Sequence, residues 1–296
     1  MTHSIKTQGH SEKGRTIKKV IVILGQTATG KSDLAVSLAK KIGGEIISAD
    51  SRQVYKNLNI GTGKITKTEM KGVLHHLLDV VSPKKKFTVV KYQKKAISVM
   101  ADIAKRGKIP IICGGTGFYI DAITKGTIFP EVPPNEKLRK SLLQKDATAL
   151  FCTLQKLDPE KAKNIDSKNK IRLIRAIEIA KAFGKVPPIT EEFPPYKFIK
   201  VGLYLPPNKL KKKIEKRVKK MFQDGLLDEI KKLKKSGVSN KRLKELGFEY
   251  FEPTYEKVVT ETLKYAKRQM TWFKRDKEIK WFDASKFTFS GIIKIL

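Results

Sequence analysis

Cysteine is scarce in this sequence. Its 296 residues include two cysteines, Cys113 and Cys152, which do not form a C-x-x-C pair. This scarcity argues against a cysteine zinc site and a disulfide framework. The sequence also has no apolar stretch long enough to span a membrane and no apolar signal region near its start. We therefore expect a cytoplasmic protein without a membrane partner.

Acidic residues are few relative to basic ones. The sequence has 29 Asp and Glu against 63 Lys and Arg, which gives a formal net charge of +34. Such an excess suits a polyanionic partner such as a nucleic acid. A lysine-rich surface that is merely solvated would give the same composition, so charge alone leaves both interpretations open.

A glycine-rich segment near the start of the chain carries the first motif. It reads Gly25-Gln26-Thr27-Ala28-Thr29-Gly30-Lys31-Ser32 and has the complete pattern G-x-x-x-x-G-K-[ST]. An apolar run typical of a buried strand precedes it, and a helical pattern follows it. In this context the backbone N–H groups bind a diphosphate or triphosphate, Lys31 supplies positive charge and the Ser32 hydroxyl binds Mg²⁺. The motif predicts a phosphate ligand but does not identify the reaction.

Strand and helix patterns alternate over the first part of the chain. Strands are expected at residues 20–24, 45–49 and 109–113, with helices at 32–42 and near 88–106. This alternation predicts a parallel sheet with crossover helices.

The second half of the chain is mostly helical in pattern. Helical segments without clear strands occupy residues 135–183 between proline-rich markers, and they predict a helical insertion over residues 126–197. Residues 200–205 are expected to form a strand that returns to the sheet, followed by long basic helices at 207–222, 225–236 and 257–275. Residues 1–18 are polar and patternless, which predicts a flexible tail.

Polar segments follow two of the predicted strands. Asp50 comes just after the apolar pair Ile46-Ile47, so it would lie at the carboxyl end of a strand, where open α/β sheets place their ligands. Its carboxylate could bind Mg²⁺, act as a general base or cap a turn. Residues 114–117, Gly-Gly-Thr-Gly, end the next strand and form either a tight turn or a close approach to a ligand.

Two C-terminal helices carry further candidates. Arg217 borders the apolar stripe of the helix 207–222 and could reach inward to a phosphate. In the last long helix, Leu263, Ala266, Met270 and Phe273 form the expected core stripe, while Tyr265, Arg268, Gln269 and Trp272 interleave on the other face. Such a face suits a nucleic acid, and equally a helix that packs on two sides. The pair His75-His76 would point to opposite faces of a strand, which argues against a shared metal ion.

Taken together, these segments resemble the tRNA dimethylallyltransferase (tRNA isopentenyltransferase) family. Many enzymes share the phosphate loop, but two segments are far more specific: Ser48-Ala49-Asp50-Ser51-Arg52-Gln53-Val54-Tyr55 and Ala266-Lys267-Arg268-Gln269-Met270-Thr271-Trp272-Phe273. Residues 59–64, 76–79, 114–116 and 172–178 match as well. The resemblance implies an α/β fold, with a P-loop NTPase-like parallel sheet flanked by helices. Residues 19–125 and 198–296 would form this catalytic core, with the helical insertion domain at 126–197.

The resemblance also implies an activity and its residues. The family transfers a dimethylallyl group from its diphosphate to N6 of an adenine beside the tRNA anticodon. It implies that the phosphate loop holds the donor with Mg²⁺, that Asp50 receives the N6 proton, and that Arg217 helps neutralise pyrophosphate. A monomer would bind dimethylallyl diphosphate and the anticodon stem-loop of tRNA. The implied tRNA contacts are Asp50, Ser51, Arg52, Gln53, Thr116, Arg139, Ile171, Arg172, Leu173, Ile174, Arg175, residues 244–249, Lys267, Arg268, Gln269, Trp272 and Lys274, and Thr116 is also implied in catalysis.

The chain departs from the family pattern at a few positions. Gln26 and Ile65 stand where the family usually has proline, and residues 246–250 match a G-Y-x-E pattern loosely. The two cysteines exclude the C-terminal zinc finger of some eukaryotic members, which indicates the bacterial type.

Three alternative functions fit parts of the sequence. A P-loop small-molecule kinase would not explain the basic, aromatic C-terminal helix. A free-adenylate isopentenyltransferase would have no need of tRNA-contact helices. A non-enzymatic RNA-binding protein would leave the phosphate loop unexplained.

Overall fold

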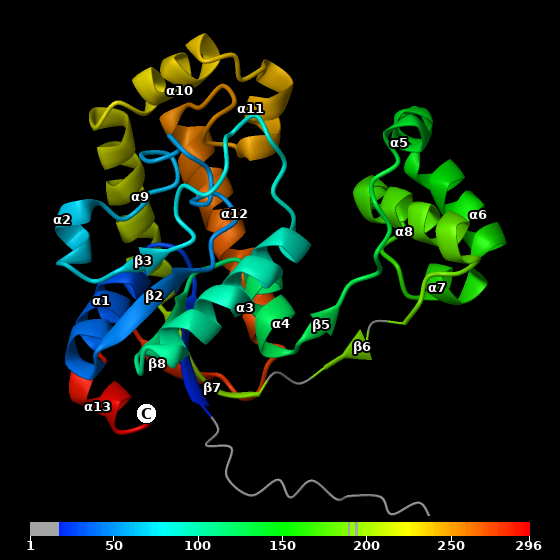
Figure 1. Ribbon diagram of the computed structural model, residues 1–296. Coiled ribbons are helices and arrows are strands. Elements are labelled where there is room, and N and C mark those ends of the chain that lie inside the picture. The colour runs from blue at the N-terminus through cyan, green and yellow to red at the C-terminus, as the bar shows by residue number, and fades with distance from the viewer. Residues whose placement is uncertain (1–17, 189, 193–194) are drawn as a thin grey trace, which may run out of the picture. The chain divides into compact units, whose positions relative to one another are not determined.

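A parallel β-sheet forms the centre of the larger of two compact units (Figure 1). The computed structural model describes residues 18–188, 190–192 and 195–296, so the predicted tail lies outside the described residues except for Lys18. The sheet has six strands in the order β3-β2-β4-β1-β7-β8, and neighbouring strands pair in parallel. The strands are β1 (Lys18–Gly25), β2 (Gly44–Ser48), β3 (His75–His76), β4 (Ile109–Cys113), β7 (Tyr196–Tyr204) and β8 (Lys280–Asp283). The predicted α/β fold class is confirmed.

Helices cover both faces of this sheet. They are α1 (Lys31–Ile42), α2 (Lys67–Met70), α3 (Val89–Lys105), α4 (Gly117–Thr124), α9 (Pro207–Gln223), α10 (Leu226–Lys235), α11 (Asn240–Leu246), α12 (Tyr255–Phe273) and α13 (Phe289–Ile293). The predicted helices match α1, α3, α9, α10 and α12 to within two residues at each end. Local signals fix several of these ends. The hydroxyls of Thr88 and Thr254 cap α3 and α12, and Gly43 ends α1 with a left-handed φ of +65°.

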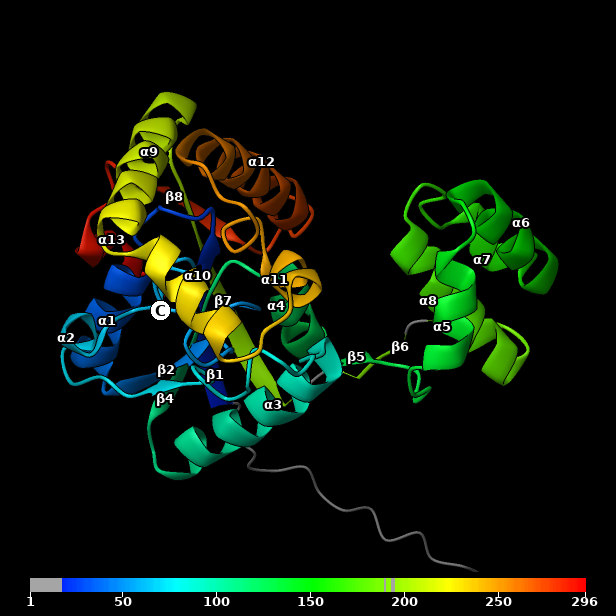
Figure 2. The ribbon, with the colours of Figure 1, turned by 90° about the horizontal axis from the view of Figure 1, so that it is seen from above.

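Side chains on both faces of β1 are buried, which explains why its apolar run shows no alternation of apolar and polar residues. Val20, Val22 and Leu24 pack in one cluster with residues of α3 and α4. Ile21 and Ile23 pack in a second cluster with residues of α1. Figures 1 and 2 accordingly show α1 and α3 on opposite faces of the sheet.

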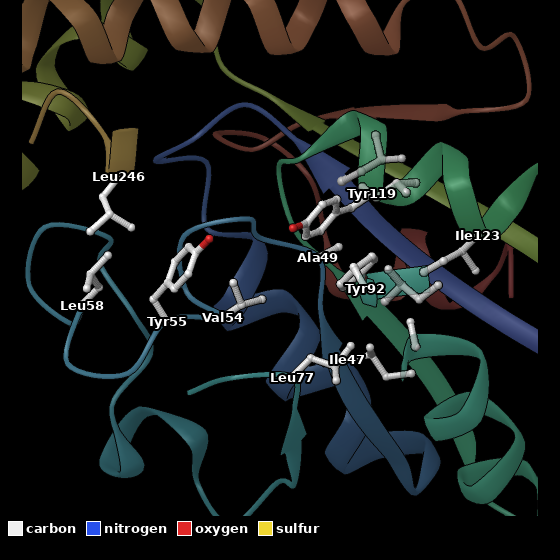
Figure 3. Packing of buried hydrophobic residues seen from close by; sticks show 14 of the residues in the cluster. Ile47, Ala49, Val54, Tyr55, Leu58, Leu77, Tyr92, Tyr119, Ile123 and Leu246 are labelled. Atoms are coloured by element: carbon white, nitrogen blue, oxygen red, sulfur yellow. The ribbon is translucent and has the colours of Figure 1, made fainter. Parts of the chain in front are cut away.

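The first cluster extends beneath the segment that follows β2. The rings of Tyr92 and Tyr119 stack there with centroids 4.0 Å apart, and Figure 3 shows both beside Ala49. Val54 and Tyr55 belong to the same cluster and are buried. The turn that carries Asp50 therefore rests on a rigid apolar base.

The strand β7 is longer than the sequence predicts. It begins at Tyr196 rather than at residue 200, because its first half pairs with β1 from Lys18 onwards. Lys197 interrupts the apolar run in this half, so the pattern alone indicates only the second half. Residues 196 and 197 consequently belong to the central sheet and not to the predicted insertion at 126–197.

Residues Lys125–Glu192 form a second compact unit with its own core. Its helices are α5 (Glu136–Leu143), α6 (Ala147–Leu157), α7 (Pro159–Lys163) and α8 (Lys170–Phe183). The core of this unit includes Leu142, Leu150, Leu154, Leu173 and Ile177. We predicted no strands here, but β5 (Thr127–Ile128) pairs antiparallel with β6 (Thr190–Glu191). Strands of two residues are too short to produce a sequence pattern.

Candidate active site

The phosphate loop connects β1 to α1 in the predicted way. Gly25 must be glycine, because a Cβ there would lie 2.1 Å from the carbonyl oxygen of Leu203. Gly30 has a φ of +85° and precedes the first turn of α1. The buried side chain of Gln26 accepts a hydrogen bond from the Leu205 N–H at 3.3 Å. Gln26, which replaces the proline common in the family, thus ties the loop to the end of β7.

Lys31 lies at this loop and is partly buried. Its ammonium group donates a hydrogen bond to the carbonyl oxygen of Gln26. Burial is the main cause that lowers the pKa of Lys31 to about 8, and the nearby positive charge of Arg217 adds to it. A bound anion would favour the protonated ammonium, so the site favours a negatively charged ligand.

Arg217 reaches the same loop from α9, as the sequence suggests. Its Nη1 donates to the Thr27 hydroxyl at 3.4 Å, and its Nη2 donates to the Thr62 carbonyl at 3.0 Å. Desolvation lowers the pKa of Arg217, while Asp50 and Glu249 oppose this effect. Two desolvated cations from distant segments therefore meet at the phosphate loop.

Asp50 uses one carboxylate oxygen to shape the turn after β2. Its Oδ1 accepts hydrogen bonds from the N–H groups of Arg52 at 2.8 Å and Gln53 at 3.2 Å. Among the described residues, Oδ2 has no hydrogen-bond donor. The sequence leaves a turn cap and a general base as alternative roles for Asp50, and its two oxygens allow both roles in one side chain.

The glycine-rich segment after β4 packs against this turn. Thr116 accepts the Ser51 N–H on its hydroxyl at 3.0 Å and donates its own N–H to the Ala49 carbonyl at 3.1 Å. Gly114 has no room for a side chain, since a Cβ would lie 2.2 Å from the Ala49 carbonyl oxygen. Thr116 thus fixes the turn that carries Asp50 and Ser51.

The helix α12 buries residues on both of its predicted faces, since Ala266 and Phe273 of the expected core stripe are buried. Gln269, expected on the outer face, is 5% exposed. Its Oε1 accepts the Thr27 N–H at 2.8 Å and its Nε2 donates to the Gly115 carbonyl at 2.9 Å, so it links the two glycine-rich segments. Leu263 and Met270, expected in the core, are only partly buried. Leu263 still packs against the core cluster that contains Ala266, so α12 packs on two sides, which is one of the two alternatives that the sequence left open.

The remaining α12 candidates divide between packing and solvent. Trp272 donates to Asp121 at 3.2 Å and fills the space that a side chain at Gly117 would need. Lys267, Arg268 and Lys274 are exposed.

In the second unit, two predicted tRNA contacts are buried. Leu173 and Ile174 lie in the core of that unit, so their side chains are not available to a ligand. These two are not available as side-chain contacts, because α8 packs within the core of its unit and buries most residues between Leu173 and Ala180. Ile171, 79% exposed, and Arg172 lie on the outer face.

Two other predicted contacts in this unit are engaged in an ion-pair cluster. Arg139 pairs with the buried carboxylate of Glu178 at 2.7 Å, and Arg175 pairs with it at 3.3 Å. Arg175 also donates to the Val132 carbonyl at 3.0 Å. Both arginines therefore stabilise the unit itself.

Glu249 lies near Arg52 and Arg217, and nothing in the sequence indicated that its carboxyl group would have an unusual pKa. Burial raises its pKa to about 7, and the charges of Arg52 and Arg217 only partly offset this effect. Its only sequence signal was the loose family match at residues 246–250.

The residues present can hold Mg²⁺ only in part. No group of three or more His, Cys, Asp and Glu side chains in the described chain is placed to bind a metal ion. His75 and His76 have separate partners, the Val73 carbonyl and Glu45. The exposed Ser32 hydroxyl at the start of α1 fits a magnesium site completed by diphosphate oxygens and water.

A family comparison decides the relationship. A sequence model described as "IPP transferase" matches residues 53–276. The chain belongs to the IPP transferase family. It is 38% identical to a tRNA dimethylallyltransferase of Anoxybacillus flavithermus, over 92% of each chain. It is 40% identical to one of Caldanaerobacter subterraneus, over 89% of this chain and 91% of the relative.

Solved structures agree with this family membership. The tRNA isopentenylpyrophosphate transferase of Bacillus halodurans superposes with a TM-score of 0.70 and 34% identity, over 94% of each chain. A eukaryotic dimethylallyltransferase acting on tRNA gives a TM-score of 0.73 at 29% identity, over 90% of this chain and 74% of that one. The family is one of prenyltransferase enzymes. Within residues 18–188, 190–192 and 195–296, no helix has the length and apolarity to cross a membrane.

Proposed function

We propose that this protein transfers the dimethylallyl group of dimethylallyl diphosphate to N6 of the adenine next to a tRNA anticodon. One observation carries the proposal. Lys31 and Arg217 both donate hydrogen bonds to residues of the phosphate loop. Arg217 also donates to the Thr62 carbonyl, which accepts the side-chain amide of Gln53 from the turn that Asp50 caps. Relatives of the chain are named for this reaction.

The donor diphosphate would bind the phosphate loop. The loop N–H groups and Lys31 would bind its oxygens, and Arg217 would approach from α9. Ser32 would hold Mg²⁺ together with the diphosphate, and the ion would add positive charge to the leaving group.

The transfer itself depends on stabilising that leaving group. The adenine amino nitrogen is a poor nucleophile because its lone pair is delocalised into the ring. The bond between the allylic carbon and the diphosphate oxygen breaks as the bond between that carbon and N6 forms, and pyrophosphate leaves with the bonding electrons. Lys31 and Arg217 neutralise the departing charge. The N6 proton passes to Oδ2 of Asp50, the oxygen that does not cap the turn.

The acceptor would bind through exposed basic and apolar side chains. Candidates are Lys267 and Arg268 on α12, Lys274 at its C-cap, and Ile171 and Arg172 on α8. The target base must leave its stack to enter a pocket, as in other enzymes that modify bases. We further propose that the protein acts as a monomer in the cytoplasm.

The direct test supplies labelled dimethylallyl diphosphate, undermodified tRNA and Mg²⁺ and measures label in the tRNA. We expect incorporation with the tRNA and none with the Lys31→Ala variant. ATP and AMP serve as control substrates. Consumption of ATP would instead indicate a kinase, and labelling of AMP would indicate a free-adenylate isopentenyltransferase.

A further inference from the structure

The buried carboxylate of Glu229 binds the loop that leads to the contacts of Arg217, and none of its hydrogen bonds in the described chain reaches the phosphate loop itself. Glu229 of α10 is 8% exposed. Its Oε2 accepts the N–H groups of Asn59 at 2.9 Å and Ile60 at 2.8 Å. Its Oε1 accepts the Gly61 N–H at 3.1 Å and the Tyr250 hydroxyl at 2.9 Å.

These four donors are all neutral. No Lys, Arg or His in the described part of the chain forms a salt bridge with Glu229. Three consecutive backbone N–H groups that converge on one anion form a concave site of the kind that binds phosphates and other free anions. Here the protein's own carboxylate occupies that site, so the negative charge determines the shape of residues 59–61.

The next residues of this loop contact Arg217, one of the two cations of the proposed diphosphate site. The Thr62 carbonyl accepts Nη2 of Arg217 at 3.0 Å. Gly63 lies directly under the guanidinium, since a Cβ at this position would be 2.3 Å from Nη2. The Thr62 and Gly63 carbonyls also accept the side-chain amide of Gln53, at 3.4 and 3.3 Å, in the turn that carries Asp50.

From these contacts we infer that Glu229 is a positioning residue for group transfer. It fixes the backbone of residues 59–61. The adjoining Thr62 and Gly63 then hold the Arg217 guanidinium at the phosphate loop, where it can stabilise the departing pyrophosphate. This inference rests on the proposed function for the role of Arg217. It assigns to Glu229 an effect on the rate of transfer and not on tRNA binding.

The central test is a double-mutant cycle with Glu229→Gln and Arg217→Ala. Glutamine has nearly the same shape, but its NH₂ group would face N–H or O–H donors where an acceptor is needed. We expect kcat to fall by about 10- to 100-fold, the scale on which misplacing a catalytic group by about an ångström acts. In the Arg217→Ala background the same change should alter kcat by less than about twofold, because residues in one network are not additive.

A mere loss of stability would give a different result. It would reduce kcat by the same factor in both backgrounds, and that additivity would overturn the inference. Full activity of Arg217→Ala alone would contradict the role of Arg217 in the proposed function instead. Asp228→Ala is the matched control on α10, since Asp228 is exposed and pairs with Lys231. It should leave kcat unchanged.

Chemical rescue gives a second, independent readout. Glu229→Ala should leave the three N–H groups facing a small anion site, so formate or acetate should restore part of the lost kcat in this variant and not in Arg217→Ala. If Glu229→Ala does not fold, Tyr250→Phe removes one of the four donors and should reduce kcat by a smaller factor. A wild-type kcat in Glu229→Gln, with folding confirmed by circular dichroism, would also refute the inference.

Discussion

The side-chain oxygen of Gln269 accepts the backbone N–H of Thr27 at 2.8 Å, which joins helix α12 to the phosphate loop. The other end of the same amide donates to the Gly115 carbonyl. The outward face of α12 carries Lys267 and Arg268, which we propose to bind tRNA. The donor and acceptor sites thus share one helix.

This relationship predicts that substitutions at two neighbouring positions, Arg268 and Gln269, affect different substrates. Gln269→Ala should leave the Thr27 N–H without its partner, at roughly 1–3 kcal/mol for such a buried group, and leave the Gly115 carbonyl with only the longer hydrogen bond from the Tyr265 hydroxyl at 3.4 Å. We expect the KM for dimethylallyl diphosphate to rise about tenfold, with tRNA affinity changed little. Arg268→Ala should show the reverse, which titration of donor and tRNA separately would reveal. Equal losses of both affinities in Gln269→Ala would argue for general unfolding of α12.

The low pKa of Lys31 predicts a pH dependence of donor binding. The ammonium is protonated below its pKa of about 8 and becomes neutral as the pH rises through that value. Affinity for pyrophosphate should therefore fall between pH 7 and pH 9 beyond any change due to pyrophosphate itself. Lys31→Arg supplies the control, since a guanidinium stays protonated in this range. If both proteins lose affinity in parallel, Lys31 does not cause the change.

Asp50→Asn separates the proposed base from the turn cap. The side-chain oxygen of asparagine can still accept the N–H groups of Arg52 and Gln53, so the fold and tRNA binding should persist. Single-turnover transfer should slow by roughly 10²–10⁴-fold, the usual contribution of a positioned base. A titration with Mg²⁺ completes the experiment. Recovery of the rate at high Mg²⁺ would assign Asp50 to metal binding. A nearly normal rate without added Mg²⁺ would mean that Asp50 only caps the turn.

Arg172 and Arg175 are close on α8 but should behave differently. Arg172 is exposed, so Arg172→Glu should weaken tRNA binding and leave the melting temperature unchanged. Arg175 pairs with the buried Glu178, so Arg175→Glu should lower the melting temperature of the second unit. Filter binding and thermal melting of both variants would distinguish the two roles.

The basic surface predicts a strong effect of salt on tRNA affinity. Contacts between Lys or Arg and phosphates release counterions, so log K should fall linearly with log salt. Arg172→Ala, Lys267→Ala and Lys274→Ala should each reduce the slope by about one unit if the residue contacts a phosphate. If none of these substitutions changes the slope of log K against log salt, the three residues do not contact tRNA phosphates.

The sequence predicts those parts of the fold that depend on local pattern. The strand β4 follows from an apolar run, and the helix α3 follows from the helical pattern near residues 88–106. The strand β3 was not among the expected strands, although His75 and His76 were considered as strand residues, because so short a strand forms only where β2 lies beside it. The long first half of β7 was missed for the same reason.

For the site, motifs identified residues but not their partners. The phosphate-loop pattern located Lys31, and the helical stripe placed Arg217 at its border. The link between Glu229 and Asn59 joins residues 170 positions apart, so no local pattern contains it. The face of α12 that carries Gln269 could be assigned either to a nucleic acid or to packing, because the helical pattern alone does not show what that face contacts.

The pairing of β1 with β7 also sets the order in which the sheet can be completed during synthesis. β1 is made first and can pair with β4, but its other side stays unpaired until β7 has emerged, after the whole of Lys125–Glu192. An apolar strand with an open edge is a template for aggregation, and closing so long a loop is slow. A nascent chain that pauses within the second unit would therefore expose the edge of residues 20–24 to other chains, and the finished protein buries that edge.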